Sequence, residues 1–210
     1  MAFLAHYRIF IIKDSMARKT ATINTNKGNA VLIGAGITEK WYFSHMQSLH
    51  NLKIKIRPRY FGDESIFAIE KQIKQVLSDG GLAIVAFDTD VPTWNEAERK
   101  RLSALKNKYK NNKHVILCDS RPSIEFWFLI HFINTNRYFG TSGNVKAELV
   151  KYIKRYDKKE PFLSKEGWVK DMISKGKFHD AYLRAKLFGT TGESYSNLWK
   201  AFEYLEDVPR

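Results

Sequence analysis

The chain has 210 residues, 44% of them hydrophobic and 14% aromatic, with a formal net charge of +13. This length and apolar content allow a buried core without disulfides and exclude an intrinsically disordered chain. No apolar run approaches the ~20 residues that a membrane-spanning helix needs, so no membrane contact is expected. The basic charge, with a pI near 9.7, predicts a polyanionic partner such as nucleic acid. A generally basic surface without such a partner is the alternative.

The N-terminal part and the cysteine content favour a cytoplasmic protein. Cys118 is the only cysteine, so it cannot form an internal disulfide, and a reducing compartment is expected. The first fifteen residues lack a small-residue cleavage site and make a poor signal peptide. Met16 is a second possible start. We expect residues 1–29 to form an N-terminal arm, of which the stretch 19–29 is polar.

The first elements alternate between strand and helix. Val31-Leu32-Ile33 predicts a buried strand that ends in a glycine-containing turn at 34–36. Thr38 is a candidate N-cap for a helix over 39–49. Apolar and basic residues then alternate from 52 to 57, which predicts a strand with one basic face.

The next part continues the alternation. Apolar residues at helical spacing from Ile66 to Leu77 predict an amphipathic helix that Gly80-Gly81 ends. The apolar run 82–87 predicts a strand covered on both faces. Thr93 is the candidate cap of a charged helix through Tyr109, with Trp94, Ala97, Leu102 and Leu105 on its inner side. Another short strand follows at 115–117, and residues 118–120 are expected to leave it.

This order predicts an α/β fold with a parallel sheet flanked by helices, placed at residues 30–135. Residues 123–132 are apolar and predict a buried helix. Beyond 136 we expect a C-terminal helical appendage packed on the sheet domain. Its expected helices cover 146–156, 165–174, 179–188 and 194–205.

Two aspartates form the firmest candidate site. Asp88 and Asp90 lie two residues apart after the apolar strand, so their side chains are expected on one side, at the end where open α/β sheets bind ligands. Close carboxylates repel unless a cation offsets them, and Mg²⁺ or Mn²⁺ suits carboxylate oxygens. Aspartates that only cap a turn are the alternative.

Two glutamates are further candidate metal ligands. Glu39 follows the first strand's turn and faces the same crevice if the first and third strands are neighbours; a Glu that only favours a helix N-terminus is the alternative. Glu125 interrupts a very apolar segment and needs a buried partner, either a metal ion or Arg121. His131 has the pattern of a core histidine.

Basic residues supply candidate contacts to nucleic acid. Lys53, Lys55, Arg57 and Arg59 follow one strand edge and suit phosphate groups. A solvated edge that lysines protect from aggregation explains the same pattern. The lysines at 106–113 are expected at a solvated helix end.

Three stretches resemble the RloB family. The run 31–43 (VLIGAGITEKWYF) is similar to that family's first Toprim motif, and Ala86-Phe87-Asp88-Thr89-Asp90 to the second. The block 119–132 (DSRPSIEFWFLIHF) resembles the third stretch, and 181–187 is a fainter match. The resemblance spans roughly residues 16 to 205 and implies a Toprim-like fold.

One position departs from the family pattern. Ala35 stands where the family's principal catalytic glutamate is expected, while Glu39 matches the second acidic residue. The alanine side chain has no oxygen that could bind a metal ion or transfer a proton. We expect that a glutamate was replaced here, which would disarm the enzyme; a naturally degenerate member is the alternative.

The resemblance implies a Toprim nuclease in anti-phage defence, paired with an ABC-type ATPase. Glu39, Asp88, Asp90 and Glu125 would hold Mg²⁺ or Mn²⁺, and Lys186 or Arg121 would stabilise transition-state charge. A non-catalytic Toprim module that binds nucleic acid or the ATPase is the second hypothesis. A primase or topoisomerase fragment is the third and weakest, and a homo-oligomer stays open.

Overall fold

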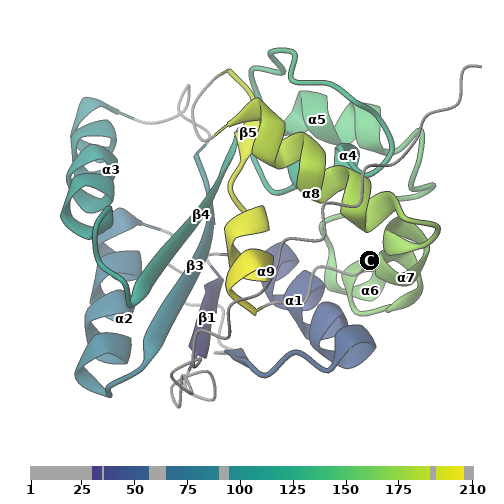
Figure 1. Ribbon diagram of the computed structural model, residues 1–210. Helices are drawn as coiled ribbons and strands as arrows, with labels where there is room; N and C mark the ends of the chain where they lie inside the picture. The colour runs from purple at the N-terminus through teal and green to yellow at the C-terminus, as the bar shows by residue number, and fades with distance from the viewer. Residues whose placement is uncertain (1–29, 35, 57–64, 90–94, 190–192, 206–210) are drawn as a thin grey trace, which may run out of the picture.

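The protein is built around a five-stranded sheet (Figure 1). A computed structural model describes residues 30–34, 36–56, 65–89, 95–189 and 193–205. The sheet order is β2-β1-β3-β4-β5; β1 to β4 are parallel and β5 is antiparallel to β4. The predicted α/β fold with a mostly parallel sheet is therefore confirmed. The strands are β1 (Ala30–Gly34), β2 (Lys55–Ile56), β3 (Leu82–Asp88), β4 (Val115–Arg121) and β5 (Tyr195–Ser196).

Alternation along the strands divides the core into two parts, one on each face of the sheet. Val31 and Ile33 of β1, with Val85 and Phe87 of β3, pack toward α2 (Ile66–Ser78) and α3 (Glu96–Tyr109). The intervening residues, such as Ile84, belong to the larger core on the other face. Both faces of β3 are therefore covered, as its continuous apolar run predicts.

The two helices on the first face have side-chain caps. Ser65 accepts a hydrogen bond from the backbone N–H of Ala68 at 3.2 Å and begins α2. Gly80, with φ of +71°, follows the end of α2, where a residue with a Cβ would be strained. The expected cap of α3 at Thr93 is wrong: Asn95 accepts from the N–H of Glu98 at 2.9 Å instead.

The prediction of which residues lie on the inner side of α3 was correct only in part. Leu102 and Leu105 are buried as expected, whereas Ala97 is exposed. The reason is the later start of the helix, which leaves Ala97 in its first turn at the margin of the sheet. Trp94 lies outside the described residues.

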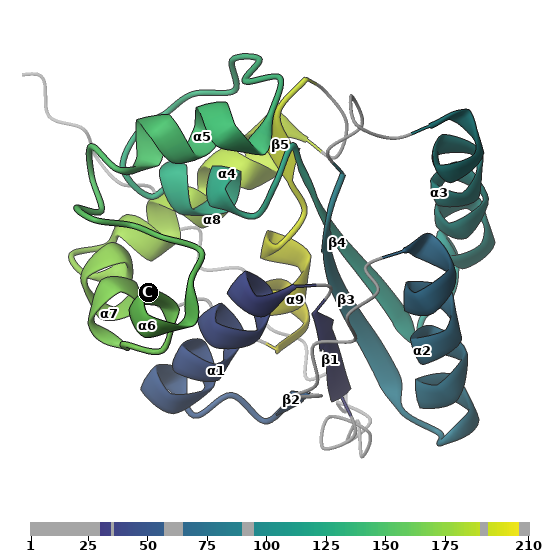
Figure 2. The ribbon, with the colours of Figure 1, turned by 180° about the vertical axis from the view of Figure 1, so that it is seen from behind.

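The second face is covered by α1 (Ile37–His50) and α9 (Trp199–Leu205), with a further group of helices beyond them (Figure 2). Aromatic side chains fill the space between these layers. The Phe202 ring of α9 lies 5.8 Å from that of Phe43 in α1, 5.9 Å from Trp127 and 4.8 Å from Phe178. The helices of this group are α4 (Glu125–Leu129), α5 (Ser142–Leu149), α6 (Glu160–Leu163), α7 (Gly167–Ile173) and α8 (Lys177–Phe188).

Several predicted boundaries were wrong. Thr38 lies inside α1, whose N-cap is Gly36 without a side-chain hydrogen bond. β4 continues to Arg121, so residues 118–120 belong to the strand. The buried helix predicted over 123–132 has only five residues in α4. Residues 195–196, expected in a helix, form β5 because their backbone pairs with Ser120 and Arg121.

The C-terminal part contributes to the sheet as well as to the helical group. β5 and α9 both come from residues beyond 136, and the larger core contains residues from β1 to α9. The boundary predicted between 135 and 136 stays a prediction, as does the arm at 1–29, which lies outside the described residues. Within the described ranges, no helix is both long enough and apolar enough to cross a membrane.

Candidate functional site

Asp88 is the residue around which the site is built. It is the last residue of β3 and follows the same alternation as Ile84 and Ala86, so it faces the side of the sheet that α1 and α4 cover. The backbone N–H of Ile124 donates a hydrogen bond to Asp88 Oδ1 at 2.7 Å. This bond joins the end of β3 to the segment that enters α4.

Glu39 approaches from the neighbouring strand's turn. It lies in the first turn of α1, where the helix dipole favours a negative charge, and is only 4% exposed. β1 pairs directly with β3, with Gly34 opposite Ala86, as the site prediction required. A Cβ at Gly34 would lie 3.2 Å from Glu39 Cβ, so glycine allows the start of α1 to pack close to the strand end.

Glu125 completes the group and is fully buried. Its carboxylate accepts hydrogen bonds from Ser123 Oγ at 2.6 Å and from Tyr156 OH at 2.8 Å. Lys158 Nζ forms an ion pair with Glu125 Oε2 at 3.0 Å. The sequence predicted that the buried Glu125 needs a partner, either a metal ion or Arg121. The cation that forms an ion pair with it is the partly exposed Lys158, on a segment that the motifs do not include.

The charges of these residues act on one another. Burial raises the pKa of Asp88 well above its ordinary value, and the carboxylates of Glu39 and Glu125 raise it further. Burial lowers the pKa of Lys158, but Glu125, Asp88 and Glu39 together raise it above its usual value. Glu39, Asp88, Glu125 and Lys158 therefore form one electrostatic group, which we call the acidic cluster.

Tyr156 belongs to the wall of this cluster. Its hydroxyl donates to Glu125, and its pKa is raised well above normal by burial first and then by the neighbouring carboxylates. The hydroxyl therefore stays protonated and remains a hydrogen-bond donor at neutral pH. Nothing in the sequence around Tyr156 and Lys158 indicates this role, because they lie more than thirty residues after Glu125 on a loop.

Four predicted site residues cannot be placed. Ala35, Asp90, Arg57 and Arg59 lie outside the described residues. Within the described part of the chain, no group of three or more Asp, Glu, His or Cys side chains lies close enough together to hold a metal ion. The acidic cluster is thus a set of mutually interacting charges and not a closed coordination sphere.

The predicted cations lie in different places. Lys186 is on α8, about half exposed, and pairs with Glu203 of α9 at 2.6 Å. Lys158, not Lys186, is the lysine that the structure brings to the carboxylates. Arg121 ends β4 and is partly exposed. Lys53 and Lys55 are exposed beside the outer strand β2, as the alternating pattern predicts.

Asp119 lies six residues before Glu125 in the sequence, but its side chain is on the other face of the sheet from the acidic cluster. It pairs in register with Phe87, one residue before Asp88, and its carboxylate accepts from Tyr195 OH at 2.8 Å and Asn197 Nδ2 at 2.7 Å. Lys106 of α3 forms an ion pair with the same carboxylate. This network attaches β5 and α3 to β4 and does not belong to the acidic cluster.

His131 is a core residue, as its pattern predicts. It is 1% exposed, and its Nδ1 bonds to the carbonyl oxygen of Trp127 at 2.8 Å. Burial lowers its pKa to about 3, so the ring is neutral at physiological pH.

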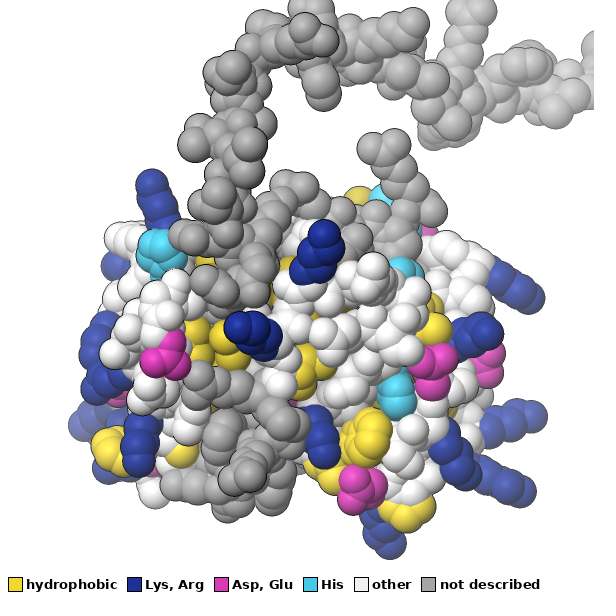
Figure 3. All heavy atoms as spheres, turned by 90° about the horizontal axis from the view of Figure 1, so that it is seen from below, with side chains coloured by type: hydrophobic (Ala, Val, Ile, Leu, Met, Phe, Trp, Pro, Cys, Tyr) yellow, Lys and Arg dark blue, Asp and Glu magenta, His cyan; other side chains and the backbone are white. Residues whose placement is uncertain are grey.

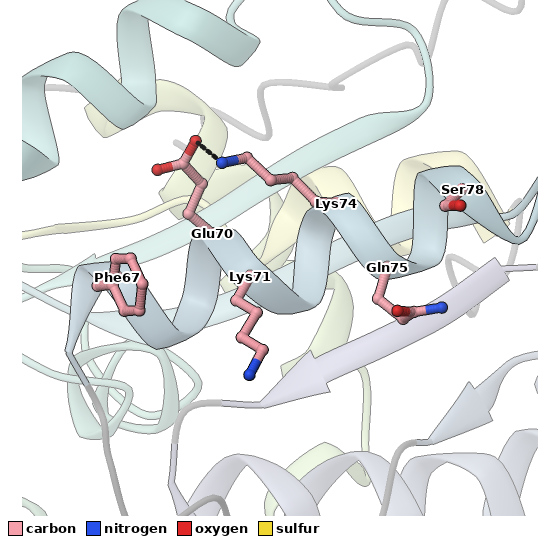
Figure 4. Close-up of a pocket in the computed structure, with 6 residues that line it drawn as sticks. All are labelled: Phe67, Glu70, Lys71, Lys74, Gln75 and Ser78. Carbon is pink, nitrogen blue, oxygen red and sulfur yellow. Dashed lines mark ion pairs between the residues drawn. The ribbon is translucent and has the colours of Figure 1, made fainter.

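The surface outside the acidic cluster is basic but varied. Figure 3 shows Lys and Arg side chains projecting from both sides of the face seen from below, with fewer acidic side chains among them. A hollow of about 350 Å³ lies along α2, and the side chains that line it all come from that helix (Figure 4). It is lined by Phe67 and by polar residues, among which Glu70 and Lys74 form an ion pair at 3.2 Å. None of these residues contacts the acidic cluster.

Comparison with known proteins gives one family. A search of curated proteins and a search of solved structures find no match. The family model described as RloB-like protein matches residues 31–203, a range that begins in β1, ends in α9 and includes every residue of the acidic cluster. The chain therefore belongs to the RloB-like family.

Proposed function

We propose that this protein is a metal-dependent nuclease of the Toprim type that cleaves nucleic acid, weakened in this form by Ala35. The observation that supports the proposal most is the acidic cluster. Three acidic residues from three separate sequence stretches meet on one face of the sheet, and the charges of Glu39 and Glu125 raise the pKa of Asp88. A carboxyl group with a perturbed pKa, gathered with other carboxylates at the carboxyl end of a parallel strand, is typical of a functional site.

The donor set suits Mg²⁺ or Mn²⁺ in its chemistry. Carboxylate oxygens are the ligands that these hard cations prefer, and a buried cluster of like charges is stabilised by a cation. No three of the described carboxylates lie close enough together to hold an ion. Asp88 would therefore bind the metal with Glu39 or Glu125, and Asp90, which lies outside the described residues, would be a further ligand. When bound, the metal would offset negative charge on the scissile phosphate and on the leaving oxygen.

The surrounding residues would keep these ligands in place. The Ile124 N–H orients the Asp88 carboxylate, while Ser123 and Tyr156 orient that of Glu125. Lys158 is partly exposed, with 37% of its side chain accessible, so its ammonium group can also meet a phosphate oxygen. We assign Lys158 the charge-stabilising role that the resemblance gave to Lys186 or Arg121.

Position 35 is the decisive one for activity. In the sequence it lies between β1 and α1, four residues before Glu39. A glutamate at this position would add the carboxylate that the family pattern contains, as a metal ligand or as a general base. With alanine there, we expect little or no cleavage.

Charge and family resemblance support a proposal for the substrate and the biological setting. The net charge of +13 favours a polyanion such as DNA or RNA, and Lys53 and Lys55 at the β2 edge are candidate phosphate contacts. Membership of the RloB-like family supports a role in anti-phage defence with an ABC-type ATPase as partner, inside the cytoplasm.

The second candidate is a non-catalytic module that binds nucleic acid or the ATPase. The ion pair between Lys158 and Glu125 favours it, because an internal cation already offsets part of the cluster's charge. The two candidates differ in whether a divalent ion binds to the acidic cluster and whether position 35 controls cleavage.

The test restores the missing side chain. Ala35→Glu is assayed with Mg²⁺ or Mn²⁺ on a mixture of duplex DNA, single-stranded DNA and structured RNA, beside Ala35→Gln, which has nearly the same shape without the charge. Cleavage by Ala35→Glu that both Ala35→Gln and Ala35→Glu/Asp88→Asn lose supports the nuclease. If folded Ala35→Glu cuts none of these substrates, the nuclease proposal fails and the binding module stands.

A further inference from the structure

A groove follows the open edge of the sheet, away from the acidic cluster. It has a volume of about 350 Å³ and is lined by residues of α3, β4 and α9 and of the segments next to these helices. Figure 1 shows these three elements. The floor of the groove is formed by Val115, Ile116 and Leu117 of β4. Three lysines line it: Lys106 belongs to α3, Lys110 directly follows α3, and Lys200 belongs to α9.

The edge of β4 is free of a partner strand in this groove. β3 pairs with Val115–Leu117 on one side, and on the other side β5 pairs with Ser120 and Arg121 only. In the described part of the chain, no strand therefore lies beside Val115–Leu117 on the side away from β3. The Asp119 carbonyl accepts from Asn197 on the β5 side, whereas the Ser120 carbonyl accepts from Thr89 on the β3 side. Main-chain groups of residues two apart in a strand point to the same side, so the N–H and C=O of Leu117 point the same way as those of Asp119, into the groove. There they can pair with an added strand.

The charge of the groove is positive. Lys106 already forms an ion pair with Asp119. Within the described residues, Lys110 and Lys200 form no ion pair; Lys200 lies over the Trp199 ring at 5.8 Å. The open main-chain groups are thus bordered by two lysines that can meet an acidic partner.

We infer that this groove binds an extended acidic segment of another protein, which adds to the sheet as a strand beside β4. Main-chain hydrogen bonds to the β4 edge would give affinity, and acidic side chains that meet Lys110 and Lys200 would select the partner. A second copy of this chain is disfavoured, because pairing two β4 edges brings the same lysines together. Nucleic acid has no ladder of N–H and C=O groups to match the edge.

Two peptides of about six residues, the length of a common strand, serve as probes. One alternates Glu and Val and the other alternates Lys and Val, each with a fluorescein label. Binding to the full chain is measured by fluorescence anisotropy at ~0.15 M salt. Hydrogen exchange reports whether the β4 amides, Leu117 in particular, become protected. A labelled oligothymidine of similar length is measured in parallel.

The variant Lys110→Glu/Lys200→Glu reverses the charge of the groove without touching the Lys106–Asp119 pair. Its control is Lys165→Glu/Lys170→Glu, which makes the same change of net charge at exposed positions near α6 and on α7. Thermal unfolding establishes that both variants are folded. A further variant, Leu117→Pro, removes the N–H that points into the groove while keeping the charge.

The inference requires three results together. The Glu/Val peptide binds and protects the β4 amides, the groove variant weakens its binding about tenfold or more, and the control variant leaves binding unchanged. It is overturned if the acidic peptide does not bind, if the Lys/Val peptide binds equally well, or if the control weakens binding as much as the groove variant. Oligothymidine binding that depends on Lys110 and Lys200, without peptide protection of β4, overturns it in favour of a nucleic-acid surface.

Discussion

The backbone N–H of Ile124 donates to Asp88 Oδ1 at 2.7 Å, and this one bond connects two stretches that are far apart in the sequence. Because Ile124 directly precedes α4, the bond sets where Glu125 begins that helix relative to the end of β3. Glu125 is then held by Ser123, Tyr156 and Lys158. The arrangement of the acidic cluster therefore depends on a main-chain contact as much as on the carboxylates themselves.

Replacing Asp88 by Asn should stabilise the protein at neutral pH. The pKa of Asp88 is higher in the folded chain than in the unfolded one, so the folded state holds an extra proton between these two pKa values. The free energy of unfolding therefore falls as the pH rises through this window and stays lower above it. Asp88→Asn removes that cost and keeps the oxygen that accepts from Ile124. We expect Tm at pH 7 to rise by about 2–4 °C, measured by thermal unfolding.

The control for this prediction is Asp171→Asn, which removes the same charge from an exposed position on α7. It should leave Tm within about 1 °C. The difference between wild type and Asp88→Asn should also shrink as the pH is lowered toward the unfolded-state pKa. An Asp88→Asn variant that is less stable than wild type at pH 7 would mean that its carboxylate is favourably paired, contrary to the prediction.

Replacing Lys158 by Met should destabilise the chain and strengthen its response to Mg²⁺. The change leaves the fully buried Glu125 without its ion-pair partner. We expect a loss of about 1–3 kcal/mol in the free energy of unfolding, less than for a fully buried pair because Lys158 is partly exposed. Since the acidic cluster then lacks its internal cation, added Mg²⁺ should raise Tm more in the variant than in wild type.

Lys159→Met is the matched control, because Lys159 is the exposed neighbour in sequence. It should change neither stability nor the Mg²⁺ response. The double variant Lys158→Met/Glu125→Gln should recover part of the lost stability, since the buried charge is removed together with its partner. If Lys158→Met costs no more than Lys159→Met, the ion pair does not stabilise the fold.

The sequence predicted the parts of the fold that repeat a regular pattern. The continuous apolar run of β3 and the helical spacing in α2 indicate elements whose burial depends on local periodicity. The placement of Asp88 and Glu39 on one face follows from these elements, because β1 and β3 are neighbours and alternate strand residues share a face.

The remaining features depend on contacts between distant segments. β5 has only two residues, and its pairing with β4 is fixed by Asp119, which binds Tyr195 and Asn197. Tyr156 and Lys158 reach Glu125 from a loop after α5. The helix predicted over 146–156 is wrong there, because α5 ends at Leu149. Asn95 replaces Thr93 as the cap of α3 because both residue types suit that position, and sequence alone does not choose between them.

Cys118 should be inert in the folded protein. It is buried in the larger core, and burial raises the pKa of its thiol to about 12. The thiol is therefore protonated and shielded at any pH from 6 to 9, and it should not react with iodoacetamide in the native state. Mass spectrometry should find one modification after unfolding in denaturant and none before. Rapid native modification would mean that the contact between β4 and α9 opens readily.

Truncating Phe202 should test whether the C-terminal region is an appendage or part of one core. Its ring is fully buried and contacts Phe43 from the N-terminal half as well as Trp127 and Phe178. If these contacts form one cooperative core, Phe202→Ala should lower the free energy of unfolding by about 3–5 kcal/mol while denaturation stays a single transition. Phe67→Ala is the matched control, since Phe67 is 69% exposed and its loss should cost less than about 0.5 kcal/mol. Two separate transitions, with only one of them shifted by Phe202→Ala, would instead establish a boundary near residue 135 and a C-terminal region that unfolds independently.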